Sequence, residues 1–332
     1  MRRRKSPWRW VRRFLFLLLV LVVAIGWAGY YLDGKLHRID ALVAYPGRVA
    51  DTPGTNWLLV GSDSRADLTP EQQEQLATGG DVGDGRTDTI MLVHIPKSGT
   101  PTMVSIPRDS YVPIPGYGTD KINAAYAFGL GEEPDDPASP RGAQLLVQTI
   151  EEVTGLHIDH YGEIGFSGFA GLVDAIGGVH LCVDQPIDDP KAGINLAAGC
   201  QTLDGAQALG FVRTRSLPGD DFTRIQNQRK FLSALLSQAT TVGTLVNPFK
   251  AWPLARDTAD TMRVDESDHL WDLARLGWAL RGNMVQTTVP IAGTEYVDVG
   301  DVVRWDSERA LEFFDALAND RPIPESLVTS GL

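Results

Sequence analysis

The sequence predicts an α/β fold, with a mixed central sheet flanked by helices on both faces and one N-terminal transmembrane helix. Apolar runs of strand length alternate with segments of helix length over most of the chain, which is typical of helices packed on a sheet. An uncharged run near the start is long enough to cross a bilayer. Several apolar runs end in segments rich in Arg and Asp, as expected where strands meet at the rim of a sheet.

The N-terminus combines a basic tail with an uncharged run. Residues 1–13 carry seven Arg or Lys and no acid, and the 19 residues 14–32 carry no charge. At about 1.5 Å per residue, a helix of that length spans roughly the 30 Å of a bilayer core. The basic flank predicts a cytoplasmic N-terminus and an extracytoplasmic remainder. A cleaved signal peptide is the alternative, but the run exceeds a typical h-region and no A-x-A site follows it, so we expect an uncleaved anchor.

The net charge of −12 is unevenly distributed. Without the seven basic residues of the tail, 23 Lys and Arg face 42 Asp and Glu, a balance of −19. So acidic a surface argues against nucleic acid as a partner, because phosphate backbones require a basic footprint. We expect a linker over residues 33–54, one extracytoplasmic domain over 55–320 and a C-terminal tail over 321–332.

Within the domain, residues 66–85 are expected to be a surface excursion, and the stretch between 239 and 266, rich in Pro and Trp, to be irregular. The periodicity otherwise predicts, in chain order, strands in 56–65, 86–95 and 101–109, helices in 120–131 and 143–155, a strand in 161–166, a helix in 167–178 and a strand in 179–183. A loop that carries Cys200 then leads to the segment 203–215. Helices in 221–239 and 266–282, a strand in 285–291 and a helix in 306–318 follow.

Two cysteines, Cys182 and Cys200, lie 18 positions apart in the part expected outside the cytoplasm. In an oxidising compartment that spacing permits a disulfide, which stabilises the fold by about 3 kcal/mol through loop entropy. Two unrelated thiols are the alternative. We expect the disulfide.

Six short segments between residues 61 and 224 repeatedly bring Arg together with Asp. Arginine forks bind phosphate oxygens, and aspartates hold a hard cation such as Mg²⁺ that bridges those oxygens. The set therefore indicates a phosphate and metal site. The segments are GSDSR (61–65), GRTDT (85–89), PRD (107–109), DKINAAY (120–126), RTR (213–215) and DDFTR (220–224).

The helix expected over 221–239 places Asp221, Arg224 and Gln228 on the side that later carries apolar residues. An inward polar stripe is unfavourable unless a partner or ligand satisfies it. The alternatives are a contribution to the site and an internal Asp221–Arg224 ion pair.

Other candidate functional residues also have purely structural explanations. Ser62 and Ser64 follow a strand, but GSDSR is not a nucleophile elbow. His157 and His160 in HIDH lack a third metal ligand further along the chain, so we expect strand-end histidines. The small residues in 121–131 suit either core packing or room for an isoprenoid chain.

Taken together, LLVGSDSR, GRTDTIMLV, SIPRDSYV, DKINAAYAFG, FSGFAGLVDAIGGV, FVRTR and DFTRIQNQ make the chain, over roughly residues 55–320, resemble the LytR–CpsA–Psr family of bacterial cell-envelope proteins. The resemblance implies a membrane-anchored phosphotransferase that moves a glycopolymer from a polyprenyl-pyrophosphate carrier onto peptidoglycan through a phosphodiester. It also implies an α/β fold around a hydrophobic pocket for the polyprenyl chain.

Position by position, the resemblance implies Asp63 and Asp88 as ligands of Mg²⁺ or Mn²⁺. The expected catalytic residues are Arg108, Arg213, Arg215, Asp88 and Asp221, with Asp88 or Asp221 as the base. The expected contacts to the polyprenyl pyrophosphate are Arg65, Arg86, Arg108, Lys121, Arg213, Arg215, Arg224 and Gln228. One departure is the triplet Asn227-Gln228-Arg229, where many relatives read Arg-Gln-Gln.

Two other functions fit the same residues. The first is a phosphatase that hydrolyses the polyprenyl pyrophosphate, with water in place of the sugar hydroxyl. The second is a non-catalytic envelope protein that binds lipid-linked polymer or regulates its assembly.

Overall fold

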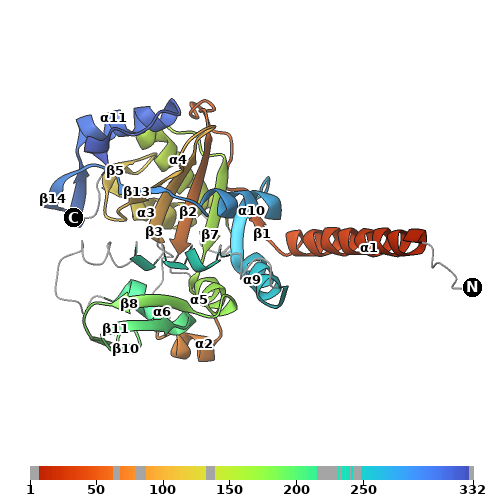
Figure 1. Cartoon of the computed structure of the whole chain (residues 1–332). Helices are drawn as coiled ribbons and strands as arrows, with labels where there is room; N and C mark the ends of the chain where they lie inside the picture. Colours follow the sequence, from red (N-terminus) through yellow and green to blue (C-terminus); the bar gives the residue numbers. More distant parts are fainter. Residues whose placement is uncertain are drawn as a thin grey trace, which may run out of the picture.

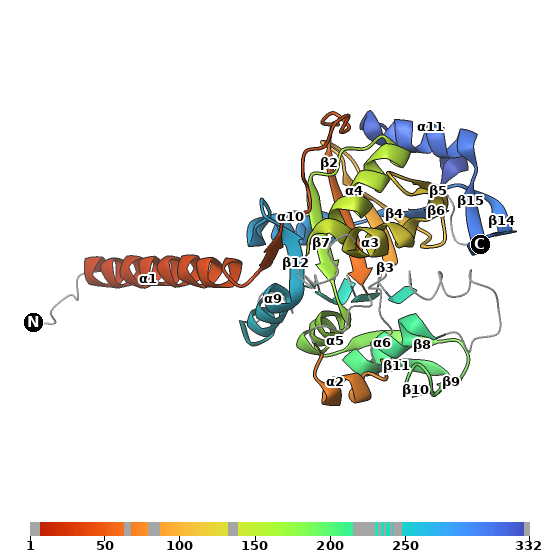
Figure 2. The ribbon, with the colours of Figure 1, turned by 180° about the vertical axis from the view of Figure 1, so that it is seen from behind.

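The computed structural model describes residues 7–62, 68–78, 87–131, 139–214 and 248–328, together with 230–231, 234–235, 237–239 and residue 241. One long helix, α1 (Pro7–Asp33), projects from a body in which helices and strands alternate (Figures 1 and 2).

A seven-stranded sheet in the order β1-β12-β7-β2-β3-β4-β13 forms the centre of that body. Three pairs are parallel (β1 with β12, β7 with β2, β4 with β13) and three are antiparallel (β12 with β7, β2 with β3, β3 with β4), so the expected mixed sheet is confirmed. The strands are β1 (His37–Ile39), β2 (Thr55–Ser62), β3 (Thr87–Ile95), β4 (Thr102–Ile106), β7 (His160–Ile164), β12 (Met262–Asp265) and β13 (Val285–Thr288).

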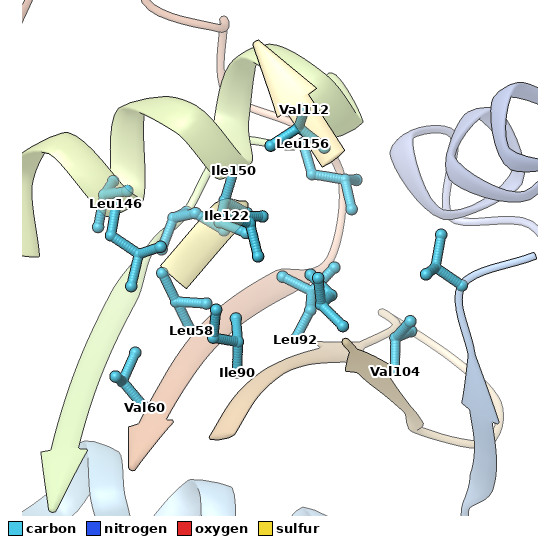
Figure 3. Close-up of a cluster of buried hydrophobic side chains, with 14 of the residues drawn as sticks. Leu58, Val60, Ile90, Leu92, Val104, Val112, Ile122, Leu146, Ile150 and Leu156 are labelled. Atoms are coloured by element: carbon cyan, nitrogen blue, oxygen red, sulfur yellow. The ribbon is translucent and has the colours of Figure 1, made fainter. Parts of the chain in front are cut away.

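One face of the sheet is tightly packed. It is covered by α3 (Ile122–Gly131), α4 (Arg141–Thr154) and α11 (Ser307–Ala318). Alternate strand residues such as Leu58 and Leu92 meet Ile122 and Ile150 of the helices (Figure 3), as the two-residue period of a strand requires.

The small residues of α3 serve this packing. A Cβ added to Gly129 would lie 2.3 Å from the carbonyl oxygen of Arg141 and 2.8 Å from the Cα of Gly142. The two glycines thus allow α3 and α4 to approach closely, and of the two alternatives for this helix the structure supports core packing.

The opposite face is covered by α9 (Pro248–Thr261) and α10 (Leu270–Ala279). Leu276 and Leu280 pack against Trp57, Val93 and Met103 of the sheet. Helices therefore cover both faces, as predicted. The prediction of an irregular stretch between 239 and 266 was wrong. This part of the chain forms α9, which contains Pro253, and strand β12 of the central sheet.

A second apolar cluster lies beside the sheet. In it α5 (Phe166–Ala175) and α6 (Gly205–Arg213) pack on β8 (Val179–Val183) and β11 (Gly199–Leu203). Cys182 and Cys200 face each other in the β8–β11 ladder and form a disulfide, which confirms that prediction. The remaining elements are α2 (Pro70–Gln75), β5 (Tyr111–Ile114), β6 (Gly118–Lys121), β9 (Ile187–Asp189), β10 (Ile194–Leu196), β14 (Ile291–Val297), β15 (Gly300–Trp305) and the 3₁₀ turn η1 (Glu325–Leu327).

The apolar part of α1, Trp10–Asp33, has a mean hydropathy of 2.3 and fits a single-pass membrane anchor. The segment after it is not the linker that the sequence predicted. Leu36 and Ala41 are buried, and His37–Ile39 forms the edge strand β1 of the central sheet. The carboxylate of Asp33 accepts a hydrogen bond from the N–H of Leu270 at 2.9 Å, so the folded part begins where α1 ends.

The disulfide yields a stability prediction. Because it closes a loop of 18 positions, replacing Cys182 and Cys200 together by Ser is expected to lower the free energy of unfolding by about 3 kcal/mol. Denaturant unfolding of the full-length protein in detergent measures this. Reductant should destabilise the wild type by a similar amount and leave the double variant unchanged; equal curves for all samples would contradict the prediction.

Candidate functional site

The antiparallel register of β2, β3 and β4 brings three polar turns to one rim of the sheet. Ser62 at the end of β2 pairs with Thr87 at the start of β3. Ile90 of β3 in turn pairs with Ile106 at the end of β4. Asp88 and Arg108 therefore lie side by side although 20 positions separate them, as the sequence predicted.

Arg108 lies between two carboxylates. Its Nη1 donates to Oδ1 of Asp88 at 2.5 Å and its Nε to Oδ2 of Asp109 at 3.3 Å. Burial by itself lowers the pKa of the Arg108 guanidinium, but Asp88 and Asp109 outweigh burial and raise that pKa above its ordinary value. The guanidinium thus keeps its charge although its side chain is only 21% exposed.

The start of α3 braces the turn that carries Arg108. The N–H of Ile122 donates to the carbonyl of Ser110 at 2.8 Å, and the N–H of Asn123 to the carbonyl of Arg108 at 3.2 Å. First-turn N–H groups have no partner inside a helix, so the turn satisfies them. The Nζ of Lys121 adds an ion pair with Asp109 at 3.0 Å.

A cavity of about 1380 Å³ lies between the second face of the sheet and helices α5, α9 and α10. Pockets for ordinary small molecules measure roughly 300–1,000 Å³, so the volume suits a larger ligand. Its charged lining residues include Asp88, Arg108, Lys191 and Arg213, whereas most of its wall is apolar. The apolar lining includes Leu59, Met91 and Met103 of the sheet, Phe166, Phe169 and Leu172 of α5, Leu254 of α9, and Leu273 and Leu276 of α10.

Two further residues predicted to contact the pyrophosphate, Arg213 and Lys121, have protein partners in the structure. Arg213 lines the cavity, but its Nη1 and Nη2 donate to the carbonyls of Leu76 and Ala77 at 3.0 and 2.9 Å. These carbonyls close α2, so Arg213 also holds that helix in place. Lys121 is not among the cavity-lining residues of the described structure, and its contact with the pyrophosphate stays a prediction.

Sequence reasoning missed Asp109, Asp189 and Lys191. Asp189 is buried and accepts a hydrogen bond from the hydroxyl of Thr214 at 2.7 Å. It thereby anchors the middle residue of the RTR segment, while Lys191 lines the cavity two positions further on. The signal in the sequence is the Asp-Asp-Pro-Lys run over 188–191, which contains no Arg.

Two hydroxyls beside Asp88 are suited to a cation. The Oγ of Ser62 and the Oγ1 of Thr87 are buried, with no hydrogen-bond partner in the described structure, which is unfavourable. Hydroxyl and carboxylate oxygens, such as those of Ser62, Thr87 and the neighbouring Asp88, are the kind of donors that Mg²⁺ prefers. The residues present thus fit the predicted metal. Within the described residues, no base is hydrogen-bonded to Ser62 to activate it as a nucleophile.

Several predicted site residues lie outside the described residues. They are Asp63, Arg65, Arg86, Arg215, Asp221, Arg224 and Gln228, together with the Asn227-Gln228-Arg229 triplet.

The histidines of the HIDH run lie near the start of β2 and β7, away from the charged rim. His160 stacks on Trp57 at 4.3 Å between ring centroids and bonds to Asp268, so its role is structural. His157 lies near Asp159 and Asp51, with potential ligand atoms within 4.8 Å of one another. The third group, Asp51, precedes the HIDH run in the sequence by about a hundred positions.

Two related proteins are similar in sequence to this chain over most of its length. A probable cell wall biosynthesis protein, LcpB of Corynebacterium glutamicum, is 52% identical over 301 residues, which cover 91% of this chain and 68% of the relative. The polyisoprenyl-teichoic acid–peptidoglycan teichoic acid transferase TagT of Bacillus subtilis is 32% identical over 263 residues, which cover 76% of each chain.

Solved structures agree on the fold. A LytR-Csp2A-Psr enzyme from Actinomyces oris, 24% identical, superposes with a TM-score of 0.63 over 86% of this chain and 96% of that one. TagT bound to LI-WTA, 25% identical, superposes with a TM-score of 0.58 over 86% of this chain and 97% of that one. The LytR_cpsA_psr family model matches residues 37–319. The resemblance seen in the sequence is thereby confirmed, and the chain belongs to the LytR–CpsA–Psr family.

Proposed function

We propose that the protein is a membrane-anchored, Mg²⁺-dependent phosphotransferase that moves a glycopolymer from a polyprenyl-pyrophosphate carrier onto peptidoglycan. One observation carries the proposal: an apolar cavity of about 1380 Å³ borders a charged rim where Arg108 lies between Asp88 and Asp109. Relatives named as teichoic acid–peptidoglycan transferases support the reaction class. The basic tail before α1 supports a cytoplasmic N-terminus and an extracytoplasmic domain.

The two parts of the cavity suit the two parts of the donor. Burying an isoprenoid chain among Leu, Met and Phe side chains removes apolar surface from water. The pyrophosphate then lies at the rim, where Arg108 and Arg213 line the cavity. A guanidinium offers paired N–H groups that match phosphate oxygens.

The proposed reaction exchanges one P–O bond for another. The acceptor hydroxyl oxygen attacks the phosphorus that carries the glycopolymer, and the bond from that phosphorus to the bridging oxygen breaks. The carrier leaves as a lipid monophosphate, whose growing charge Arg108 stabilises. A carboxylate accepts the hydroxyl proton, and Asp88, with its side chain 37% exposed, is accessible for this role. Asp221 is the second candidate.

The cation site combines the predicted ligands Asp63 and Asp88 with the hydroxyls of Ser62 and Thr87. Mg²⁺ bound there supplies positive charge to the pyrophosphate oxygens. Arg108 bonds to Oδ1 of Asp88, so the other oxygen of that carboxylate would be left to hold the cation.

Replacing Arg108 by Ala is expected to reduce transfer roughly 100- to 1,000-fold, the loss seen when a preorganised donor to a developing charge is removed. Full-length protein in proteoliposomes is supplied with a polyprenyl-pyrophosphate-linked oligosaccharide and peptidoglycan fragments, and the phosphodiester product is quantified by mass spectrometry.

The matched control is Arg321→Ala, which removes an exposed arginine paired with Asp315 on the surface and should leave the rate within about twofold. An Arg108→Ala variant that remains folded and transfers at the wild-type rate overturns the proposed site. Release of lipid phosphate at the same rate with and without acceptor indicates hydrolysis instead of transfer.

Asp88→Asn keeps an oxygen that accepts the Arg108 hydrogen bond but removes the charge that binds a cation or accepts a proton. We expect the Mg²⁺ concentration for half-maximal transfer to rise at least tenfold and the maximal rate to fall. A titration of rate against Mg²⁺ measures both quantities. An unchanged titration curve contradicts the assignment of Asp88 to the metal.

A further inference from the structure

The outward face of α10 has an unusual composition. Trp271, Arg275 and Trp278, at positions i, i+4 and i+7, lie on one side of the helix. Trp271 is 52% exposed and Trp278 67% exposed, whereas the outward face of a surface helix is ordinarily polar and charged. Arg281 lies over the Trp278 ring, 5.0 Å from its centroid. Alternating Trp and Arg is typical of helices that lie in a membrane interface.

The position of α10 agrees with that composition. Asp33, the last residue of α1, bonds to the N–H of Leu270 at 2.9 Å and approaches Nδ1 of His269 at 3.1 Å. In both ribbon views α9 and α10 lie beside the end of α1 (Figures 1 and 2). Because a helix of 27 residues is about 40 Å long, its end lies at the outer interface when it crosses a bilayer.

Helix α9 meets the same end of α1. The Tyr31 ring stacks on Trp27 of α1, with centroids 5.7 Å apart, and on Trp252 of α9, with centroids 6.3 Å apart. Tyr and Trp are the residues enriched at the level of lipid headgroups. Aromatic side chains of both helices therefore gather near this end of α1.

The inner faces of these two helices form a wall of the cavity. Leu254 and Thr258 of α9 and Leu273 and Gly277 of α10 line it. Ala274, Trp278 and Arg281 line it as well and are also exposed, so the cavity reaches the surface along the Trp and Arg face. Its charged rim with Arg108 is formed by other elements, the strand ends of the sheet.

We infer that the outward face of α10 rests in an anionic bilayer interface and that the lipid tail of the donor passes directly from the bilayer into the cavity beside α10. This inference rests on the proposed function for the identity of the lipid. Direct passage keeps the isoprenoid chain out of water throughout, which the hydrophobic effect favours. Arg275 and Arg281 attract anionic headgroups to this face although the exported part as a whole is acidic.

Photolabelling tests the contact without reference to catalysis. Full-length protein is reconstituted in vesicles that contain anionic lipid with a diazirine on the acyl chain, irradiated and digested. Label is expected in the peptide that contains residues 270–281 as well as in α1. Tyr296 and Leu311 are 79% and 73% exposed on β14 and α11, away from α1 in Figure 1, and their peptides should remain unlabelled. Label confined to α1 overturns the inference.

A double variant, Trp271→Ser with Arg275→Glu, tests the passage of the lipid. Neither residue lines the cavity in the described structure. We expect kcat/KM for a long-chain donor embedded in vesicles to fall at least tenfold, and kcat/KM for a short-chain, water-soluble donor to stay within twofold. The matched control, Tyr296→Ser with Leu311→Ser, should leave both values within twofold.

The outcomes separate the two claims. An equal loss on both donors, or no loss on either, overturns lateral passage while the transferase stands. A wild-type protein that transfers from neither donor overturns the proposed function, and the photolabelling result then still decides whether α10 contacts the bilayer.

Discussion

The register of three antiparallel strands is the constraint on which the site depends. Because β2, β3 and β4 alternate in direction, the end of one strand lies beside the start of the next, and Asp88 meets Arg108. The same register decides which residues face each side. Leu58 and Leu92 point into the packed core, while Leu59 and Met91 point into the cavity. A shift by one residue would fill the cavity face with core side chains and separate the charged pair.

The charged rim shows how a half-buried arginine is kept in place. Taking an arginine out of water is unfavourable unless carboxylates and hydrogen bonds compensate. Arg108 has both: two carboxylates at its guanidinium and a backbone turn held by the start of α3. Lys121 supports the second carboxylate from behind. The DKIN segment and the start of α3 therefore brace the turn that carries Arg108.

Much of the fold could be predicted, because the periodicity of apolar residues within a short stretch of sequence indicates a strand or a helix. The strand ends that carry Asp88 and Arg108 were predicted, as was the Cys182–Cys200 pair. The exceptions were decided by tertiary contacts. Met262–Asp265 is short and follows a helix that contains Pro253, so it becomes a strand only through its pairing with β1 and β7. Asp189 supports the site from the end of β9, in a segment without Arg, and Asp51 lies close to His157 although about a hundred positions separate them. No pattern within a short window contains such information.

The hydrogen bond between Asp33 and Leu270 fixes how the folded domain is rotated about the axis of α1. A flexible linker would let the domain turn freely above the membrane, but here α10 and β1 are attached directly to the end of the helix. One residue added within the last turn of α1 would rotate the domain by about 100° around the helix axis. The number of residues in α1 therefore determines the direction in which the folded domain faces above the membrane, in addition to anchoring the domain there.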